Sequence, residues 1–307
     1  MPERSNCYRS RLGAEGCPPR RLIAEGASEL ASAGIENPRL DAETMLAAVC
    51  HNSRAAVIAG LAEVNQNARE RYAAMITRRM RREPLAYILG HKEFYSLEFE
   101  VTPAVLIPRP ETEAVVYAAL EFIQDRVHAR VCDLGTGSGA IALAIAANAP
   151  AAQLIATDIS ADALAIAHRN TVRLELTSRV RFRLADCFEP LDSMGPLGRF
   201  DFIVSNPPYI SDDQMAGLAP EIRGYEPHAA LAGGHGGLEL YRRIAPALTD
   251  HLEQNGSAIM EIGADQSAAV TAIMRNAGAS SIKVLFDLAG LPRVVVAHFE
   301  GRGRWTK

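Results

Sequence analysis

The sequence predicts an α/β fold in which a mostly parallel sheet follows a small all-α domain. Beyond Glu111, short apolar runs alternate with longer amphipathic stretches, as strands alternate with covering helices. The continuous apolar run Phe202-Ile203-Val204 is typical of a strand buried on both faces of a parallel sheet. Between Arg20 and Glu83, by contrast, apolar residues recur at helical spacing.

The chain is expected to divide where this pattern changes. A helical domain is predicted over residues 20–85, and Asn37-Pro38-Arg39-Leu40-Asp41 separates its first two helices, with Pro and Asp well placed at a helix start. Residues 86–110 form short segments rich in aromatic and β-branched residues, which predict a β-hairpin connector. The remaining expected parts are a poorly ordered N-terminal extension (1–19), an α/β domain (111–300) and a C-terminal tail (301–307).

The α/β domain is predicted to hold a seven-stranded sheet. The expected strands are 130–134, 152–157, 179–184, 200–205, 257–262, 282–286 and 293–298. The expected helices are 112–126, 140–149, 161–175, 238–252 and 264–276. Only Asp287 to Pro292 separate the last two strands, which is too short for a covering helix, so we expect that pair to be antiparallel.

Composition limits the class of protein. The chain has 307 residues, of which 48% are hydrophobic and 22% charged, as in ordinary globular proteins. No apolar stretch approaches the ~18 to 20 residues that a membrane helix needs, so no membrane contact is expected. Residues 1–21 lack the apolar core of a secretory signal and carry Glu3 and Glu15. A cytoplasmic location is therefore expected, with a mitochondrial presequence as the weaker alternative.

Cysteine and histidine spacing favours neither a disulfide framework nor a metal site. The five cysteines are an odd number without metal-ligand spacing, and the eight histidines are dispersed. We expect reduced thiols and no metal. The cysteines are Cys7, Cys17, Cys50, Cys132 and Cys187.

Charge is distributed unevenly. Residues 1–90 hold 13 Lys and Arg against 10 Asp and Glu, a formal +3, which leaves 19 against 26, or −7, for the remainder. Six arginines surround apolar residues at helical spacing between Arg69 and Arg82. This stretch is either the solvated face of a helix or a patch that contacts RNA, the ribosome or a partner protein.

A glycine-rich loop follows the first predicted strand. Asp133-Leu134-Gly135-Thr136-Gly137-Ser138-Gly139 leads into an alanine-rich helix, and its glycines allow a sharp turn and close approach to a cofactor. Asp158, at the end of the second strand, suits a ribose diol. Both features fit a nicotinamide enzyme or an S-adenosylmethionine enzyme, because Gly135-x-Gly137-x-x-Ala140 also matches the dinucleotide fingerprint. A strand-to-helix turn without a ligand is the remaining alternative.

Asn206-Pro207-Pro208-Tyr209 follows the fourth predicted strand and has the residue types of a binding site for an amine or amide NH2 group. The Asn206 side-chain oxygen and a neighbouring backbone carbonyl would be two fixed acceptors for one NH2 group. Pro207 and Pro208 fix φ and carry no N–H that would compete for those acceptors. Tyr209 would cover the face of a planar group. A plain turn at a strand end is the alternative.

The two motifs together favour one reaction. The glycine loop, Asp158, Asp186 and Asn206 follow successive strands, and open α/β sheets bind ligands at the carboxyl ends of their strands. Hydride transfer needs no pair of acceptors that clamps an amine, whereas methyl transfer to nitrogen does. The sequence therefore predicts a class I S-adenosylmethionine-dependent methyltransferase with a Rossmann-like sheet, in which Asn206 and Pro207 are catalytic.

Several longer segments resemble the PrmC/HemK family of protein-(glutamine-N5) methyltransferases over roughly Leu22 to His298. They are Gly90-x-x-x-Phe94, Val105 to Glu113 (Val-Leu-Ile-Pro-Arg-Pro-Glu-Thr-Glu), the glycine loop, Ser205 to Ile210, Glu226-Pro227-x-x-Ala230-Leu231 and Leu238-x-x-Tyr241-Arg242. The resemblance implies N5-methylation of a glutamine amide in peptide chain release factors, the glutamine of their Gly-Gly-Gln motif. The helical domain is expected to bind the substrate or a partner, with bracing of the sheet as the alternative.

The resemblance assigns residues to two ligands. S-adenosylmethionine is expected at Asp133, Gly135, Thr136, Gly137, Ser138, Gly139, Asp158, Ile159, Asp186, Cys187, Phe188 and Asn206. The glutamine amide is expected at Asn206, Pro207, Pro208, Tyr209, Arg109 and Glu111. Asp133 is expected to orient the glycine loop through backbone N–H groups. Arg109 and Glu111 are candidates either for shaping the glutamine pocket or for a salt-bridged hinge between the domains.

Two positions depart from the family pattern, and two rival functions stay open. Cys187 stands where an aromatic residue is common, so adenine stacking must weaken or pass to Phe188. Gly236 stands where Asp is common, which removes a helix cap or loop tie. One rival is an N-methyltransferase of adenine or guanine, for which the acidic second half speaks against DNA but not RNA. The other is a non-catalytic, translation-associated binding module.

Overall fold

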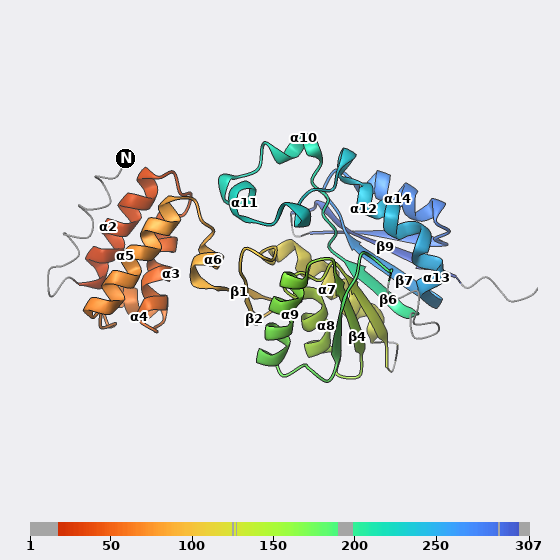
Figure 1. Ribbon diagram of the computed structural model, residues 1–307, viewed down its shortest axis with the longest axis horizontal. Coiled ribbons are helices and arrows are strands. Elements are labelled where there is room, and N and C mark those ends of the chain that lie inside the picture. Colours follow the sequence, from red (N-terminus) through yellow and green to blue (C-terminus); the bar gives the residue numbers. More distant parts are fainter. Residues whose placement is uncertain (1–17, 125, 127, 190–198, 288, 301–307) are drawn as a thin grey trace, which may run out of the picture. The chain divides into compact units, whose positions relative to one another are not determined.

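The computed structural model describes residues 18–300 except 125, 127, 190–198 and 288 (Figure 1). The expected N-terminal extension, apart from Pro18 and Pro19, and the expected tail therefore lie outside the described residues. Contacts divide the chain into two units. The helical unit contains the chain up to Gly90 and the separate segment Ala219–Tyr225, and the sheet unit contains His91–Leu218 and Glu226 onwards.

Four helices build the core of the helical unit, in red to orange in Figure 1. They are α2 (Pro19–Ser32), α3 (Pro38–Val49), α4 (Arg54–Ala59) and α5 (Gln66–Met80), and a fifth, α6 (Leu85–Leu89), follows. Pro38 occupies the start of α3 as predicted, because its fixed φ and missing N–H suit a first helical position. Tyr72 of α5 is fully buried and donates a hydrogen bond to the Leu22 carbonyl of α2 at 3.2 Å. This bond joins two helices that are fifty residues apart in the chain.

A short helix from the second half of the chain completes the helical unit. α11 (Pro220–Tyr225) is held by Glu221, which accepts from Arg79 Nη1 at 3.1 Å and from Arg82 Nη2 at 2.8 Å. The Tyr225 hydroxyl donates to the Arg81 carbonyl at 2.7 Å. Because nothing in the local pattern of residues 219–225 points to a distant partner, the sequence did not indicate this placement.

The arginine-rich helix α5 and the residues after it are largely engaged within the protein. Arg69 and Arg79 are buried, and Arg79 also donates to Asp41 at 2.7 Å. Arg78 pairs with Glu83 at 2.5 Å. Arg71 and Arg81 are the exposed arginines of this stretch. The solvated-face interpretation is therefore wrong for Arg69 and Arg79: Arg69 donates to the Val64 carbonyl at 3.3 Å, and Arg79 is buried against Asp41 and Glu221.

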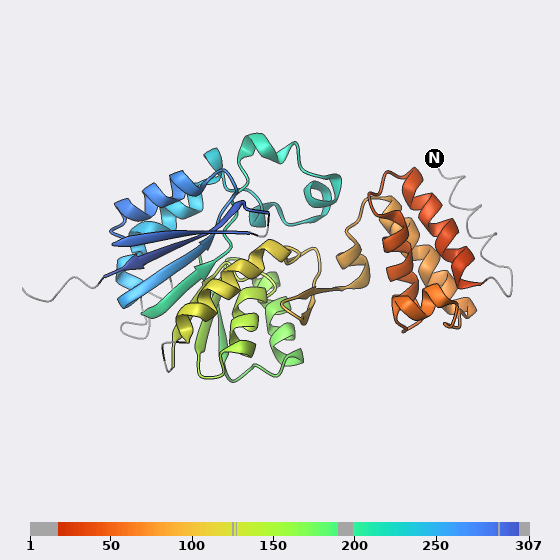
Figure 2. The ribbon, with the colours of Figure 1, turned by 180° about the vertical axis from the view of Figure 1, so that it is seen from behind.

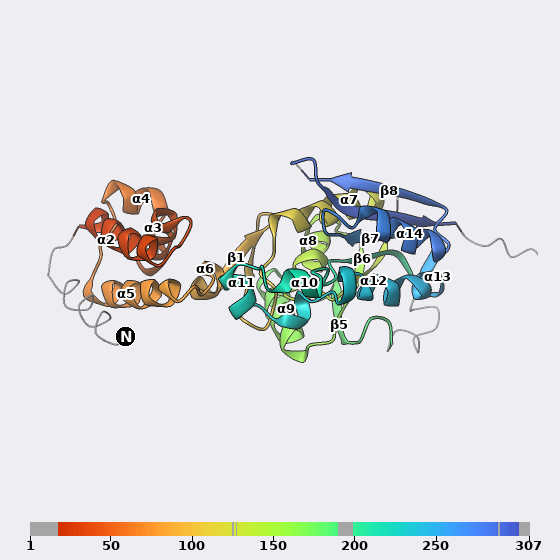
Figure 3. The same cartoon turned by 90° about the horizontal axis from the view of Figure 1, so that it is seen from above.

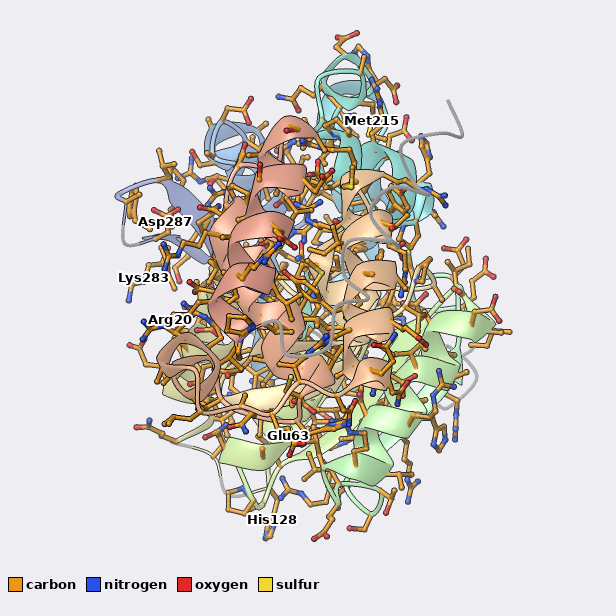
Figure 4. The ribbon with its side chains drawn as sticks, turned by 90° about the vertical axis from the view of Figure 1, so that its left-hand side faces the viewer. Arg20, Glu63, His128, Met215, Lys283 and Asp287 are labelled. Carbon is orange, nitrogen blue, oxygen red and sulfur yellow. The ribbon has the colours of Figure 1, made fainter. Side chains whose placement is uncertain are left out.

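The Glu221 ion pairs lead to a stability prediction. Burial alone would raise the pKa of Glu221, but hydrogen bonds from its own backbone and from Arg82 and Arg79 bring that pKa below its ordinary value. Glu221→Gln should weaken the docking of α11 by about 1 to 3 kcal/mol, as measured by faster backbone hydrogen exchange over residues 219–225. The matched control is Glu63→Gln, an exposed glutamate of the same unit (Figure 4), which should leave exchange unchanged. Equal exchange in the two variants would show that the ion pairs do not hold α11.

The predicted hairpin is confirmed, although the connector does not begin as a strand. β1 (His91–Phe94) and β2 (Leu97–Glu100) pair antiparallel. The two-residue turn has positive φ at Tyr95 (52°) and Ser96 (59°), the conformation that matches the twist of a hairpin. Residues 85–89 form helix α6, although the sequence predicts the connector from residue 86, and Gly90 ends that helix at φ 83°.

The sheet unit contains the seven predicted strands in the order β5-β4-β3-β6-β7-β9-β8. They are β3 (Arg130–Leu134), β4 (Gln153–Asp158), β5 (Val180–Leu184), β6 (Phe200–Ser205), β7 (Leu252–Glu261), β8 (Ser281–Phe286) and β9 (Pro292–Phe299). β3 to β7 are parallel, and β9 runs antiparallel to both neighbours, as predicted for the last pair. Figure 2 shows this pair at one edge. Asp287, in its turn, accepts from the backbone N–H groups of Ala289 and Leu291 at 2.9 Å (Figure 4).

Helices cover both faces of the sheet (Figures 1 and 3). α7 (Glu113–Ile123), α8 (Ala140–Asn148) and α9 (Ala161–Arg173) lie on one face, and α12 (Glu239–Ile244), α13 (Leu248–His251) and α14 (Ser267–Asn276) on the other. The predicted helix 238–252 is wrong in being continuous: the 3-10 turn Ala245–Ala247 interrupts it at Pro246, which has no N–H to donate. α10 (Asp212–Met215) and the short turns His228–Ala230 and His235–Gly237 were not predicted.

Among residues 18–300, leaving aside the gaps named above, no helix is long and apolar enough to cross a membrane. Within the same residues, no group of three or more His, Cys, Asp or Glu side chains is arranged to hold a metal ion. Cys50, Cys132 and Cys187 are free thiols.

Candidate active site

The order in which the chain adds strands to the sheet reverses at β3. The candidate residues lie at the carboxyl ends of the strands on either side of this point. β4 lies on one side of β3 and β6 on the other, so Leu134 pairs with both Thr157 and Ser205. The Ser205 hydroxyl donates to the Leu134 carbonyl at 2.7 Å, which ties the two strand ends together. Such a reversal point is where open α/β sheets bind ligands. Asn206 and Asp158 therefore flank the glycine loop.

The three glycines of the loop have different structural roles. All have positive φ: 71° at Gly135, 56° at Gly137 and 84° at Gly139. A Cβ at Gly135 or Gly137 would meet no atom within 4 Å, so these two positions border open space. A Cβ at Gly139 would come within 3.0 Å of Leu143 and 3.3 Å of Ala167, so Gly139 allows α8 and α9 to pack closely. The first two fit close approach of a ligand, and the third fits helix packing.

Asp133 lies beneath the loop and is fully buried. The Thr136 hydroxyl donates to its Oδ2 at 2.6 Å, and the Ala142 N–H donates to the same atom at 3.3 Å. Burial raises the Asp133 pKa to about 7, against the lowering effect of these two bonds. Its contacts are those of a residue that holds the loop against the start of α8.

Asp158 lies at the end of β4 and also contacts the loop. Its carboxylate accepts from the N–H of Gly137 at 2.8 Å and of Ser160 at 2.9 Å. Burial raises its pKa, and these bonds lower it. A carboxylate has about four lone-pair positions, so it retains capacity to accept from a hydroxyl of a diol. The neighbouring Ile159 side chain is 65% exposed.

The three candidate cofactor residues after β5 are engaged in contacts within the protein to different degrees. Asp186 pairs with Arg243 at 2.7 Å. Cys187 has φ 57° and is half-buried, and burial raises its pKa to about 11. Phe188 is 4% exposed, and its ring stacks on that of His251 with centroids 4.3 Å apart. Phe188 is thus part of the core, and its placement leaves little ring face for adenine.

Asn206 and Tyr209 are fixed by polar partners in the sheet unit. Asn206 is half-buried and donates from Nδ2 to the Thr112 hydroxyl at 3.1 Å. Its Oδ1 and the Pro207 carbonyl accept no hydrogen bond from the residues that the structure describes. The Tyr209 hydroxyl donates to Glu261 at 3.2 Å, and burial raises the Tyr209 pKa well above its ordinary value. Two acceptors therefore stay available next to each other.

A glycine segment packs flat against the backbone of this motif. A Cβ on Gly233 would come within 2.7 Å of the Pro208 carbonyl oxygen, and one on Gly237 within 2.0 Å of the Tyr209 carbonyl oxygen. Gln266 donates from Nε2 to that Tyr209 oxygen at 2.8 Å. Gly236, the position that departs from the family pattern, is exposed, and α12 begins without a side-chain cap.

Arg109 and Glu111 occupy different environments. Arg109 donates to the buried Glu226, which also accepts from the Ile107 N–H at 3.2 Å. Both partners belong to the sheet unit, so this ion pair ties residues 107–109 to the segment after α11 and is not a bridge between domains. Glu111 is exposed, and its charge contributes to raising the Glu261 pKa.

Sequence reasoning missed four polar residues that support the motif. They are Thr112, Glu226, Glu261 and Gln266. Glu261 ends β7, the strand beside β6, so the strand-end argument extended to a fifth strand identifies it. Thr112 and Glu226 lie within segments that resemble the PrmC/HemK family, but their partners are 94 and 117 residues away.

The seven-stranded sheet, with the glycine loop, Asp158 and Asn206 at its reversal point, is that of a class I S-adenosylmethionine-dependent methyltransferase. Residues 21–90 match the family described as PrmC N-terminal domain, and residues 117–221 match the methyltransferase small domain. The release factor glutamine methyltransferase of Koribacter versatilis is 41% identical over 88% of this chain and 94% of its own. That of Moorella thermoacetica is 42% identical over 91% and 98%. The chain belongs to the release factor glutamine methyltransferase family.

Similarity to solved structures supports the fold alone. The hMettl16 catalytic domain, solved in complex with a MAT2A 3'UTR hairpin, has a TM-score of 0.53 at 17% identity, covering 80% of this chain and 89% of that one. Identity at this level says nothing of substrate.

Proposed function

We propose that this protein transfers a methyl group to the N5 atom of a glutamine side chain in peptide chain release factors, the glutamine of their Gly-Gly-Gln motif, in the cytoplasm. The observation that carries the proposal is the pair of unoccupied acceptors, Asn206 Oδ1 and the Pro207 carbonyl, one strand from the glycine loop. Family membership supports the choice of substrate.

The residues around the glycine loop fit S-adenosylmethionine. This cofactor supplies an electrophilic methyl group on a sulfonium. Gly135 and Gly137 allow the backbone to approach it, because open space borders both. Asp158 would accept from the ribose hydroxyls, and the exposed Ile159 side chain next to it would contact the adenine. Asp186 and Cys187, at the end of the neighbouring strand, would border the same ring.

Asn206 and Pro207 act on the substrate amide by position and charge. An amide nitrogen is a poor nucleophile because its lone pair is delocalised. Two acceptors on its N–H groups orient the nitrogen and stabilise the positive charge that develops there. Pro207 and Pro208 keep the corner rigid, and Tyr209 would cover the plane of the amide. No dedicated base is needed, because the methylated nitrogen is acidic and loses its proton to solvent.

A cofactor-binding prediction follows from Asp158. Asp158→Ala should weaken S-adenosylmethionine binding about tenfold to a hundredfold in calorimetry, because hydrogen bonds to a charged group are lost. Activity at saturating cofactor should fall much less. Asp162→Ala, an exposed acid in the first turn of α9, is the matched control and should bind normally. Equal affinities in the two variants would remove Asp158 from the site.

The function is tested with labelled S-adenosylmethionine and separate pools of release factor, RNA and DNA, followed by mass mapping of the product. We expect label on one glutamine of the release factor. Label on nucleic acid alone would replace the protein substrate with an adenine or guanine amine. Cofactor binding without transfer to any pool would identify a binding module.

A further inference from the structure

Gln266 is a buried residue whose amide joins the Asn-Pro-Pro-Tyr motif to the end of β7. It is 7% exposed and lies directly before α14. Its Oε1 accepts from the Gly263 N–H at 3.0 Å, and its Nε2 donates to the Tyr209 carbonyl at 2.8 Å. The same Nε2 faces the carbonyls of Gly236 and Gly237 at 3.2 and 3.3 Å. One amide therefore connects the motif, the glycine segment and the chain after β7.

The partners of Gln266 allow only one orientation of its amide. A backbone N–H can only donate, so the atom that faces Gly263 is the amide oxygen, and a backbone carbonyl can only accept, so the atom that faces Tyr209 is the nitrogen. A Cβ at Gly237 would come within 2.4 Å of Nε2, and one at Gly263 within 2.9 Å of Oε1. The two glycines therefore leave the space that the amide fills.

Residues at the end of β7 hold Tyr209 at two points. Gln266 bonds to its backbone carbonyl, and Glu261 accepts from its hydroxyl at 3.2 Å. Glu261 ends β7, and Gly263, which donates to Gln266, follows two residues later. Asn206 directly follows β6, the strand that pairs with β7. One end of the motif is thus fixed by β6, and the other end is fixed by the chain that leaves β7.

The position of Tyr209 affects the acceptors that the reaction needs. Tyr209 is two residues from the Pro207 carbonyl, and Pro207 and Pro208 have fixed φ, so a displacement of the Tyr209 backbone is passed on to that carbonyl. We propose that Gln266 is the positioning residue that holds Asn206 Oδ1 and the Pro207 carbonyl in the geometry that receives the substrate amide. It acts through the Tyr209 carbonyl and not on the substrate itself.

Gln266→Glu tests the donated hydrogen bonds at nearly unchanged side-chain size. The ionised carboxylate still accepts from Gly263, but it has no proton for the Tyr209 carbonyl and repels that oxygen. At about pH 8.5, kcat on release factor should fall about tenfold to a hundredfold, while calorimetric S-adenosylmethionine affinity stays unchanged. Burial beside carbonyl oxygens should raise the pKa of the new carboxyl, so the ratio of variant to wild-type kcat should recover several-fold towards about pH 6, where a donor returns.

Two further variants complete the test. Gln266→Met keeps the length of the side chain and has no N–H to donate, so its kcat should be low at every pH and should not recover. Gln153→Glu is the matched control, because it makes the same change at an exposed glutamine at the start of β4. Its kcat should stay within about twofold of the wild type at each pH. Melting temperatures are measured in parallel, and kcat is measured at a temperature at which each variant is folded.

A merely structural role for Gln266 predicts a different result. Gln266→Glu would then have a lower melting temperature, but the folded protein would keep the wild-type kcat and the wild-type pH dependence, and this outcome overturns the proposal. A loss of cofactor affinity as large as the loss of kcat also overturns it, because the change would then not be confined to the substrate motif.

This inference rests on the proposed function, and the two fail differently. A wild-type protein that does not methylate release factor overturns the substrate assignment. A wild-type protein that does, together with a Gln266→Glu variant that is fully active at high pH, overturns the positioning role alone.

Discussion

Replacement of Asn206 by alanine is expected to lower kcat on release factor about a hundredfold or more while S-adenosylmethionine affinity stays nearly unchanged. The variant loses Oδ1, one of two acceptors that meet the substrate amide, and preorganised groups of this kind contribute about 10²- to 10³-fold to rate. The lost bond to Thr112 should lower stability by only about 1 kcal/mol. Steady-state kinetics with calorimetric cofactor binding measures both quantities.

Asn148→Ala is the matched control for this experiment. Asn148 ends α8, and its amide donates to the Ala144 carbonyl of the same helix, so the change removes one comparable bond away from the motif. Its kcat should stay within about twofold of the wild type. If Asn206→Ala lost cofactor binding and activity in equal measure, Asn206 would serve the fold, and the acceptor mechanism would fail.

Gly237→Ala is expected to reduce kcat/KM by two orders of magnitude or more and to lower the melting temperature. Its Cβ would lie 2.0 Å from the Tyr209 carbonyl oxygen and 2.4 Å from Gln266 Nε2, so the backbone of the substrate motif must move. Displacements of about 1 Å in a catalytic constellation can reduce the rate about a hundredfold. The clash is with backbone, which no change of side-chain rotamer relieves.

Gly236→Ala is a close control because the two glycines have nearly the same positive φ. φ is 65° at Gly236 and 69° at Gly237, so both variants carry the same left-handed strain of about 1 to 2 kcal/mol. A Cβ at Gly236 would meet only Leu238, at 4.0 Å. Equal activities in the two variants would show that the contact with Tyr209 does not position the motif.

The order of strands and helices followed from the sequence because each depends on local periodicity. The run Phe202 to Val204 and the alanine-rich stretch after Gly139 produce β6 and α8 close to their expected bounds. The glycine loop, Asp158 and Asn206 were identified as a group because parallel strands place their carboxyl ends at one edge. The interruption at Pro246 was also within reach of the sequence, since proline lacks the required N–H.

The supporting contacts were not accessible in the same way. Asn206 and Thr112 are 94 residues apart, and Arg79 and Glu221 are 142 apart. In the sequence, Thr112 is an ordinary residue for the start of a helix, and Glu261 is an ordinary residue for the end of a strand. No local pattern indicates that Asn206 donates to Thr112 or that Tyr209 donates to Glu261, because both bonds depend on which segments become neighbours in the fold.

The sequence by itself determined the class of chemistry, because functional groups and backbone freedom are properties of single residues. The examples are the two prolines after Asn206 and the glycines where φ is positive. Only the tertiary structure decided which contacts position the residues that carry out that chemistry. It placed Gly237 against Tyr209, brought α11 to the helical unit, and set the Tyr209 hydroxyl against the Glu261 carboxylate. The physical reason is that hydrogen-bond direction and close packing act over a few ångströms, between residues that the chain brings together only by folding.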